Sequence, residues 1–205
     1  IPTVLINGVT SVDGRAAADT VGGTGFNRPE DLEIQTLANG SQFLYFNATD
    51  PDGNTFSIKL IDALNASVNL FVNRSTIDQA TGLAVGNVFT NPDNLGIDAA
   101  GNIYIVEDQP GGVADIWFAK DTNRDGVAES IGRWASMSTQ GAEPTGLYFD
   151  LFNPHVAYIN VQHANSDLDR TIQINAVPEP ATYTMMLAGL GLLAVTARRR
   201  TRHSS

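Results

Sequence analysis

The chain has 205 residues, no cysteine and a formal net charge of −10. The lack of cysteine excludes disulfides and thiolate-bound metals within these residues. The acidic balance disfavours nucleic-acid binding and suits cations instead.

The first predicted elements belong to an internal repeat. Each copy opens with a polar residue and a proline, then continues as a strand whose apolar side chains alternate with other residues, the two-residue period of a β-strand. A strongly apolar second strand and a third strand follow each time. The first strands cover residues 28–34, 91–98 and 143–150, the second strands 43–47, 103–108 and 157–163, and the third strands 55–60, 115–119 and 170–174.

This repeat predicts an all-β fold. Three or four antiparallel strands, repeated, describe the blades of a β-propeller, in which roughly 4 to 8 such sheets surround one axis. A β-sandwich is the alternative, but it does not account for the same polar-proline opening in each copy. We expect residues 1–177 to form a partial β-propeller of about three blades, too few to close a ring. On this interpretation the chain is the C-terminal part of a longer protein.

Polar side chains recur at two places in the repeat, beside each proline and at the end of each second strand. Equivalent positions of a propeller surround its axis, so we expect these side chains to face a common channel mouth. They are Arg28, Glu30, Asp93, Asn94 and Glu143 beside the prolines, and Asn47, Glu107, Asn160 and His163 at the strand ends. Carboxylate and amide oxygens suit Ca²⁺ or Mg²⁺, and a cation offsets the repulsion between neighbouring carboxylates.

An ordinary structural role explains some of these residues better than others. Asp93 and Asn94 fit turn hydrogen bonding as well as they fit metal binding. Glutamate is a poor turn residue, so Glu30, Glu107 and Glu143 are the predicted metal ligands.

A second candidate site lies in the loop that begins at Asp121. Oxygen side chains at Asp121, Asn123 and Asp125, with Gly126 in the sixth place, reproduce the first half of an EF-hand loop. The twelfth place holds Gly132 instead of a glutamate, so an EF-hand is excluded. The segment predicts a hairpin loop that holds one Ca²⁺, and a turn rich in Asp, Asn and Gly without metal explains it equally well.

The C-terminal segment has a composition of its own. After Pro178-Glu179-Pro180, residues 181–197 are apolar or small, and an arginine cluster follows at 198–202. A run of about 17 apolar residues is at the short end for a membrane-spanning helix, and arginines directly after it predict a cytoplasmic C-terminus. A buried C-terminal helix is the alternative.

This order of motif, hydrophobic helix and basic cluster resembles the PEP-CTERM sorting signal of Gram-negative bacteria. The resemblance implies that residues 178–205 are an address label that an exosortase processes. Before processing, the helix over 181–197 would anchor the protein in the membrane. Cleavage near the Pro-Glu-Pro motif would then release the body to the cell envelope or the extracellular matrix.

The body in turn resembles the PhoX-type alkaline phosphatases, over roughly residues 26–174. The similar stretches are 27–31, 107–109, 141–146 and 160–163. Members of this family are secreted β-propellers that hydrolyse phosphomonoesters with calcium and iron. The resemblance implies that Glu30, Glu107 and Glu143 are metal ligands at the channel mouth. The family's iron site also uses a cysteine from an earlier blade, which this chain lacks.

Two functions remain open. The first is the C-terminal part of an exported, metal-dependent phosphomonoesterase that uses Ca²⁺, and iron in the full-length protein, and acts on a phosphate ester. Arg28 is then the candidate catalytic residue, because a guanidinium can hold phosphate oxygens in bidentate fashion. The second is a non-catalytic, calcium-stabilised propeller of the cell surface or extracellular matrix, which the sorting signal suits equally well.

Overall fold

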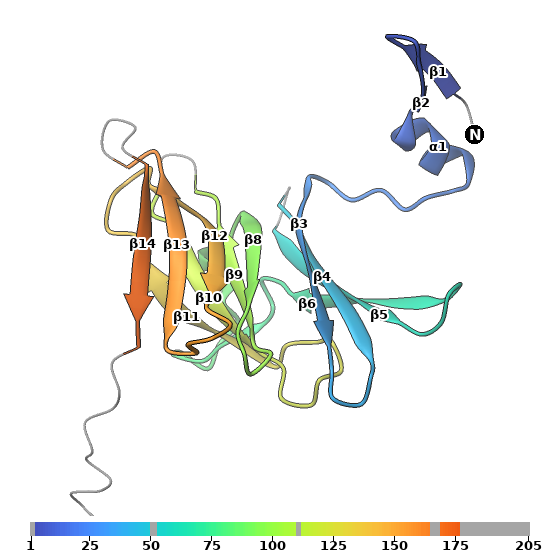
Figure 1. The fold of residues 1–205 in the computed structure, drawn as a ribbon. Coiled ribbons are helices and arrows are strands. Elements are labelled where there is room, and N and C mark those ends of the chain that lie inside the picture. Colours follow the sequence, from blue (N-terminus) through green and yellow to red (C-terminus); the bar gives the residue numbers. More distant parts are fainter. Residues whose placement is uncertain (1–2, 50–52, 110–111, 165–168, 177–205) are drawn as a thin grey trace, which may run out of the picture. The chain divides into compact units, whose positions relative to one another are not determined.

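The computed structural model describes residues 3–49, 53–109, 112–164 and 169–176, and almost all of its regular structure is β (Figure 1). The chain divides into two compact units, Ile1–Ile174 and Asn175–Ser205. The predicted hydrophobic helix over 181–197 lies outside the described residues. Within the described ranges, none of the helices is long and apolar enough to cross a membrane.

A small hairpin and a helix come first in the chain. Strand β1 (Thr3–Ile6) pairs with β2 (Val9–Val12), and helix α1 spans Gly14–Thr20. Asp13 caps this helix, because its side chain accepts a hydrogen bond from the backbone N–H of Ala16. The repeat pattern did not predict these elements.

The first repeat forms an antiparallel four-stranded sheet in the order β3-β4-β5-β6. Its strands are β3 (Pro29–Thr36), β4 (Gln42–Ala48), β5 (Asn54–Leu60) and β6 (Ala66–Val72). Asn39 and Gly40 form the turn between β3 and β4, where Gly40 has a φ of 83°, the left-handed conformation that such hairpin turns require.

The second and third repeats form sheets of five and three strands, in the orders β7-β11-β10-β9-β8 and β12-β13-β14. The second sheet is antiparallel except at its edge, where β7 pairs in parallel with β11. A 3₁₀ turn, η1 (Gly86–Val88), precedes β8. The strands are β7 (Ile77–Asp78), β8 (Pro92–Ile97), β9 (Ile103–Glu107), β10 (Asp115–Lys120), β11 (Ser130–Ser136), β12 (Glu143–Phe149), β13 (Val156–Gln162) and β14 (Arg170–Asn175).

Alternating side chains pack the three sheets face against face. Ile105 and Trp117 of the second sheet share a buried cluster with Tyr45 of the first. Their sequence neighbours point to the other face, where Val106 and Ile116 pack with residues of the third sheet such as Ile159. The second sheet therefore buries both of its faces, as a blade in the middle of a propeller does.

The innermost strands carry the three prolines of the repeat. Strand β8 contacts β3 on one side and β12 on the other. Pro29 pairs with Ala48, Pro92 with Glu107, and Pro144 with Val161. In each sheet the pairing register shifts shortly after the proline, at a β-bulge. The prolines thus occupy equivalent places, and the prediction of an all-β partial propeller is confirmed.

Candidate functional site

The proline ends of the three sheets bring acidic side chains together around Asp93. Burial and then the neighbouring carboxylates of Glu30, Asp108 and Glu143 raise the pKa of Asp93 to about 6, while Arg28 opposes them. These five residues are called the proline-end cluster below. Four of them were predicted from the sequence. Asp108 was not among the candidate site residues, although it follows the predicted ligand Glu107 directly.

Arg28 and Glu30 stand at the exposed side of this cluster. Arg28 Nη2 lies 3.6 Å from Glu30 Oε1, and the two side chains are 49% and 36% exposed. An ion pair this exposed contributes little to stability, because water screens it. Arg28 has a φ of 46°, a conformation uncommon outside glycine, and its carbonyl accepts a hydrogen bond from the N–H of Thr49. The backbone conformation and this hydrogen bond therefore fix the position from which the Arg28 side chain extends.

Glu143 is the more buried carboxylate, with its side chain 20% exposed. The side-chain amide of Gln162 donates to its Oε1 at 2.5 Å, and His163 Nε2 lies 3.8 Å from its Oε2. His163 has a φ of 58°. Two polar side chains at the end of β13 thus contact the Glu143 carboxylate, and these contacts hold its orientation in the cluster.

The side-chain amides of Asn47 and Asn94 form hydrogen bonds to the innermost strand of the next sheet. Asn47 is fully buried, and its amide donates to the carbonyls of Asp93 and Asn94 at 2.9 and 3.2 Å. Asn94 in turn accepts hydrogen bonds from the Gly146 N–H at 2.8 Å and from the Thr145 hydroxyl. These contacts use the side chains to hold sheet against sheet, which is the structural role that the sequence left open for Asn94.

Two further residues make similar structural contacts. Asn160 accepts a hydrogen bond from the Thr171 hydroxyl at 2.7 Å, within the third sheet. Asp31, which was not a candidate, accepts one from the N–H of Leu95 at 2.8 Å and so ties β3 to β8. The position two residues after the proline, Asp31 and then Asn94, therefore makes the connection to the next sheet each time.

The structure places Glu107 differently from the prediction. Its side chain is 1% exposed and accepts hydrogen bonds from the N–H groups of Thr90 and Asp115 and from the indole of Trp117, at 2.9, 3.0 and 2.9 Å. Burial raises its pKa to about 7, although these three donors lower it. The carboxylate is committed to holding β9, β10 and the segment before β8 together. Its role as a metal ligand stays a prediction, and it requires some of these donors to be released.

The pairing register explains why Glu107 points inward. The sequence comparison aligned Glu107 with Asn47 and Asn160, but the proline partners show that it corresponds to Ala48 and Val161. A shift of one residue along a strand moves a side chain to the opposite face of the sheet. Asp108, the next residue, is the one that reaches the proline-end cluster.

The loop after β10 satisfies its own polar groups. Asp121 accepts hydrogen bonds from the N–H groups of Asp125 and Gly126, at 3.3 and 3.1 Å. The Asn123 side chain also accepts from the Asp125 N–H, at 2.9 Å, and Asp125 accepts from Val127 at 2.9 Å. These are ordinary turn contacts of Asp and Asn. Calcium binding here stays a prediction.

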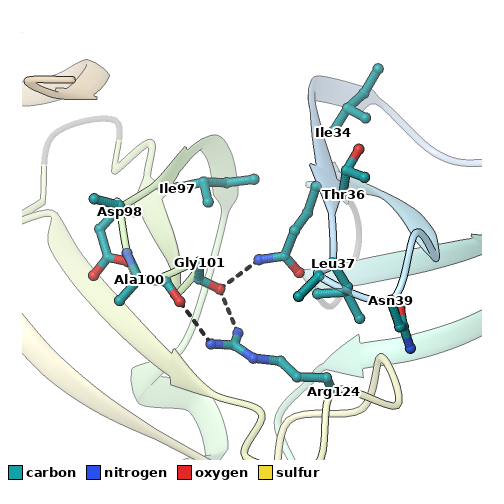
Figure 2. A pocket seen from close by; sticks show the side chains of 12 residues that line it. Ile34, Thr36, Leu37, Asn39, Ile97, Asp98, Ala100, Gly101 and Arg124 are labelled. Atoms are coloured by element: carbon teal, nitrogen blue, oxygen red, sulfur yellow. Dashed lines mark hydrogen bonds between the residues drawn. The ribbon is translucent and has the colours of Figure 1, made fainter.

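A cavity of about 720 Å³ lies between the β3–β4 hairpin and the β8–β9 hairpin, at the strand ends away from the prolines (Figure 2). The Gln35 amide donates to the Gly101 carbonyl at 2.6 Å. Arg124 donates to the same carbonyl and to that of Ala100, at 3.1 Å for the latter. Arg124 comes from the loop just described, which follows β10, so its contacts with the β8–β9 hairpin stay within the second sheet. The hydrogen bond from Gln35 is the one that joins the two sheets here. None of the residues that line the cavity belongs to the proline-end cluster.

The carboxylate oxygens of the proline-end cluster are the kind of donor that a hard cation such as Ca²⁺ prefers. They do not, however, converge on a single position. Among the residues that the structure describes, no group of three His, Asp or Glu side chains is placed to hold one ion. Burial first, and then the three neighbouring carboxylates, raise the pKa of Asp93, so its ionised form is disfavoured there. A cation in the cluster would stabilise the ionised carboxylates.

Comparisons with known proteins agree with this fold. Residues 5–165 match the family profile of the alkaline phosphatase PhoX, and residues 176–200 match the PEP-CTERM protein-sorting motif. A solved structure, Pseudomonas fluorescens PhoX in complex with vanadate as a transition-state analogue, is similar with a TM-score of 0.59 and 20% identity. The match covers 79% of this chain and 36% of that chain, and at this identity it shows the fold alone. No match was found among curated proteins.

Proposed function

The chain belongs to the PhoX family of alkaline phosphatases, and from this membership we propose that it is part of an exported phosphomonoesterase whose site includes the proline-end cluster. The family match and the fold support phosphatase-like function. The observation that carries the proposal is the meeting of Glu30, Asp93 and Glu143, one from each sheet, with Arg28 beside them. Because the chain spans about a third of the similar PhoX chain, further site residues would come from elsewhere in the protein.

Arg28 is proposed to bind the phosphate ester. Its guanidinium sits at the exposed edge of an otherwise acidic cluster, paired loosely with Glu30 at 3.6 Å. A phosphate oxygen would compete with this exposed carboxylate, since charge-assisted contacts from Arg to phosphate are strong and directional. Four nearby carboxylates would repel the phosphate unless their charge is offset.

A divalent cation is the proposed source of that offset. The oxygen donors of Glu30, Asp93, Asp108 and Glu143 are those that calcium prefers. When bound, such an ion neutralises charge on phosphate oxygens and orients the attacking group. In this chain, Gln162 and His163 would keep Glu143 oriented toward the cluster, and Asn47 would hold the backbone carbonyls of Asp93 and Asn94.

Iron would require ligands beyond these residues. The chain has no cysteine, so the thiolate that the family resemblance implies is not available from it. The same fact supports the second proposal, a non-catalytic, calcium-stabilised propeller of the cell surface. Both proposed proteins bind calcium, but only the phosphomonoesterase turns over a phosphate ester.

Sorting by an exosortase is proposed for the C-terminal segment. The PEP-CTERM match over residues 176–200 indicates export to the envelope of a Gram-negative bacterium. Membrane anchoring through 181–197 and cleavage near Pro178-Glu179-Pro180 are the finer steps of this proposal. Mass spectrometry of the exported protein should find a C-terminus near this motif, and a mature product that retains Arg198 to Arg200 would argue against processing.

Hydrolysis of p-nitrophenyl phosphate by the protein as its gene encodes it tests the catalytic proposal. We expect turnover in the presence of calcium, loss of turnover on chelation, and a large decrease in the Asp93→Asn and Arg28→Ala variants. Asp19→Asn, an exposed carboxylate in α1, is the matched control and should retain full activity. A protein that binds calcium but shows no turnover would support the non-catalytic propeller instead.

A further inference from the structure

Two large apolar side chains project from the turn of the β12–β13 hairpin. Leu151 and Phe152 are 77% and 95% exposed there. Pro144 lies near the start of β12, whereas Phe149, which pairs with Ala157, lies at its other end. The turn is therefore at the strand ends away from the prolines, opposite the proline-end cluster. Leu151 and Phe152 are called the apolar tip below.

The turn that carries the apolar tip does not itself require large apolar residues. The Asp150 carboxylate accepts hydrogen bonds from the N–H groups of Phe152 and Asn153, at 2.8 and 3.0 Å. In the second sheet, Asp98 follows β8 in the same way and accepts a hydrogen bond from the Ala100 N–H at 2.9 Å. Ala100 takes the place of Phe152 there. Since alanine serves the same kind of turn, local structure does not explain the exposed phenylalanine.

The backbone of this turn is hydrogen-bonded within the protein. Besides the two contacts to the Asp150 carboxylate, the Asp150 N–H donates to the Val156 carbonyl, and the Val156 N–H donates to the Asn153 carbonyl, both at 3.0 Å. A backbone group that meets lipid has no water to bind, so it needs a partner within the protein. The turn meets this condition at these groups. Phenylalanine and leucine are also side chains that bury at the boundary between lipid headgroups and acyl chains.

The chain leaves the third sheet at the same end. Strand β14 is the neighbour of β13 and begins at the proline end, where the His163 N–H donates to the Asp169 side chain at 3.2 Å. It then runs away from the prolines and ends at Asn175 (Figure 1). Neighbouring strands lie about 5 Å apart, so the chain leaves close to the strand that the apolar tip precedes.

The distance along the chain from β14 to the apolar stretch 181–197 is short. Residues 176–180 are the only ones between Asn175 and this stretch. A fully extended chain covers about 3.5 Å per residue, so these six steps span at most about 20 Å. Anchoring through 181–197 therefore brings the end of β14 within this distance of the bilayer, on the side of the sheet from which the apolar tip projects.

The charges around the apolar tip disfavour electrostatic attraction to lipid. No lysine or arginine occurs between Glu143 and Asp169, and Asp150 places a negative charge beside the tip. Anionic lipids attract basic segments and repel acidic ones. Contact would therefore depend on the burial of apolar side chains and would be insensitive to salt.

We propose, on the premise that the C-terminal segment anchors the protein as described under the proposed function, that Leu151 and Phe152 contact the surface of the lipid bilayer. The tip and the anchor are then two attachments at one end of the third sheet. Together they turn the proline ends of the strands away from the bilayer. The proline-end cluster would thus face the surrounding medium, from which a phosphate ester arrives.

Fluorescence quenching by spin-labelled lipids tests this contact. The unprocessed protein, with its C-terminal segment, is reconstituted in phosphatidylcholine vesicles. Single cysteines, introduced as Leu151→Cys or Phe152→Cys, carry the fluorophore NBD, and peptide mass spectrometry confirms the labelled site. Ser138→Cys is the control, because Ser138 is exposed and follows β11 at the proline end. We expect quenching at both tip positions to exceed that at the control at least about threefold, and high salt to leave it unchanged.

Cosedimentation with the vesicles separates this proposal from the anchoring on which it rests. Protein that cosediments but is quenched equally at the tip and at Ser138 would refute the tip contact and leave the anchoring intact. Protein that does not cosediment would refute the anchoring and the tip contact with it. A blue shift of NBD at the tip without quenching by lipid, together with a dimer in sedimentation, would show that a second copy of the chain covers the tip instead.

Discussion

The replacement Glu107→Gln tests whether Glu107 is a buried structural carboxylate. In the native state the pKa of Glu107 is raised to about 7 from 4.5, chiefly by burial. The native state therefore holds this proton more tightly than the unfolded chain does, and stability falls as the pH rises from 4.5 through 7. A shift of this size corresponds to roughly 3 kcal/mol of unfolding free energy.

Glutamine keeps the shape of the side chain and has no proton to lose. Its Nε2 cannot accept the hydrogen bond that the Asp115 N–H donates to Oε2, so we expect a loss of about 1–3 kcal/mol near pH 4.5. Between pH 4.5 and 8 the variant should gain up to about 3 kcal/mol relative to the wild type, which acquires a buried charge over this range. The assay is urea unfolding between pH 4.5 and 8 with a chelator present, followed by tryptophan fluorescence. The Asp19→Asn variant is the control for a carboxylate on the surface.

The difference between the two unfolding free energies is the quantity that matters, because other carboxylates titrate equally in both proteins. A difference that stays constant with pH would refute the reasoning. A variant that loses stability relative to the wild type as the pH rises would show that the three hydrogen-bond donors outweigh burial, so that Glu107 is favoured in its ionised form.

Three further predictions concern contacts between the sheets. Gly126→Ala should destabilise the protein by about 1–3 kcal/mol in urea unfolding, since a Cβ there would lie 2.6 Å from the Ser57 hydroxyl at a φ of 88°. Gly40→Ala, with a similar φ of 83° but open space around it, should cost only about 1 kcal/mol, and equal losses would exclude the close contact as the cause. Asn94→Ala should cost about 1–3 kcal/mol, because the Gly146 N–H loses its acceptor, and an unchanged denaturation midpoint would contradict the joining role of this side chain.

The repeat and the strand alternation made most of the fold predictable. The polar-proline opening and the apolar second strands predicted the order of the sheets, and each predicted strand begins and ends within two residues of the observed one. The fourth strand of the first sheet, β6, was not predicted, although residues 66–72 alternate in the same way. Helix α1 was missed because seven residues give too little periodicity to recognise.

The sequence predicted which parts of the strands contribute to the candidate site, but not the pairing register that decides which side chains face it. Residues beside the prolines were found, because the proline itself marks the position. Residues at the ends of the second strands were not all found, because Glu107 lies opposite its proline whereas Asn47 and Asn160 lie one residue before that place. This shift of one residue reverses which side chain faces the site. Glu107 and Asp108 exchanged places for this reason. The sequence alone carries no signal for that shift.

Calcium-dependent thermal stability of the protein as its gene encodes it tests the central claim most directly. If the proline-end cluster binds the ion, calcium at about 100 times its dissociation constant should add roughly 2.7 kcal/mol of stability and raise the melting temperature. Glu143→Gln removes one charge from the cluster and should strongly reduce that rise, while Asp19→Asn should leave it unchanged. An equal rise in the wild type and in Glu143→Gln, or no rise in either, would contradict the claim.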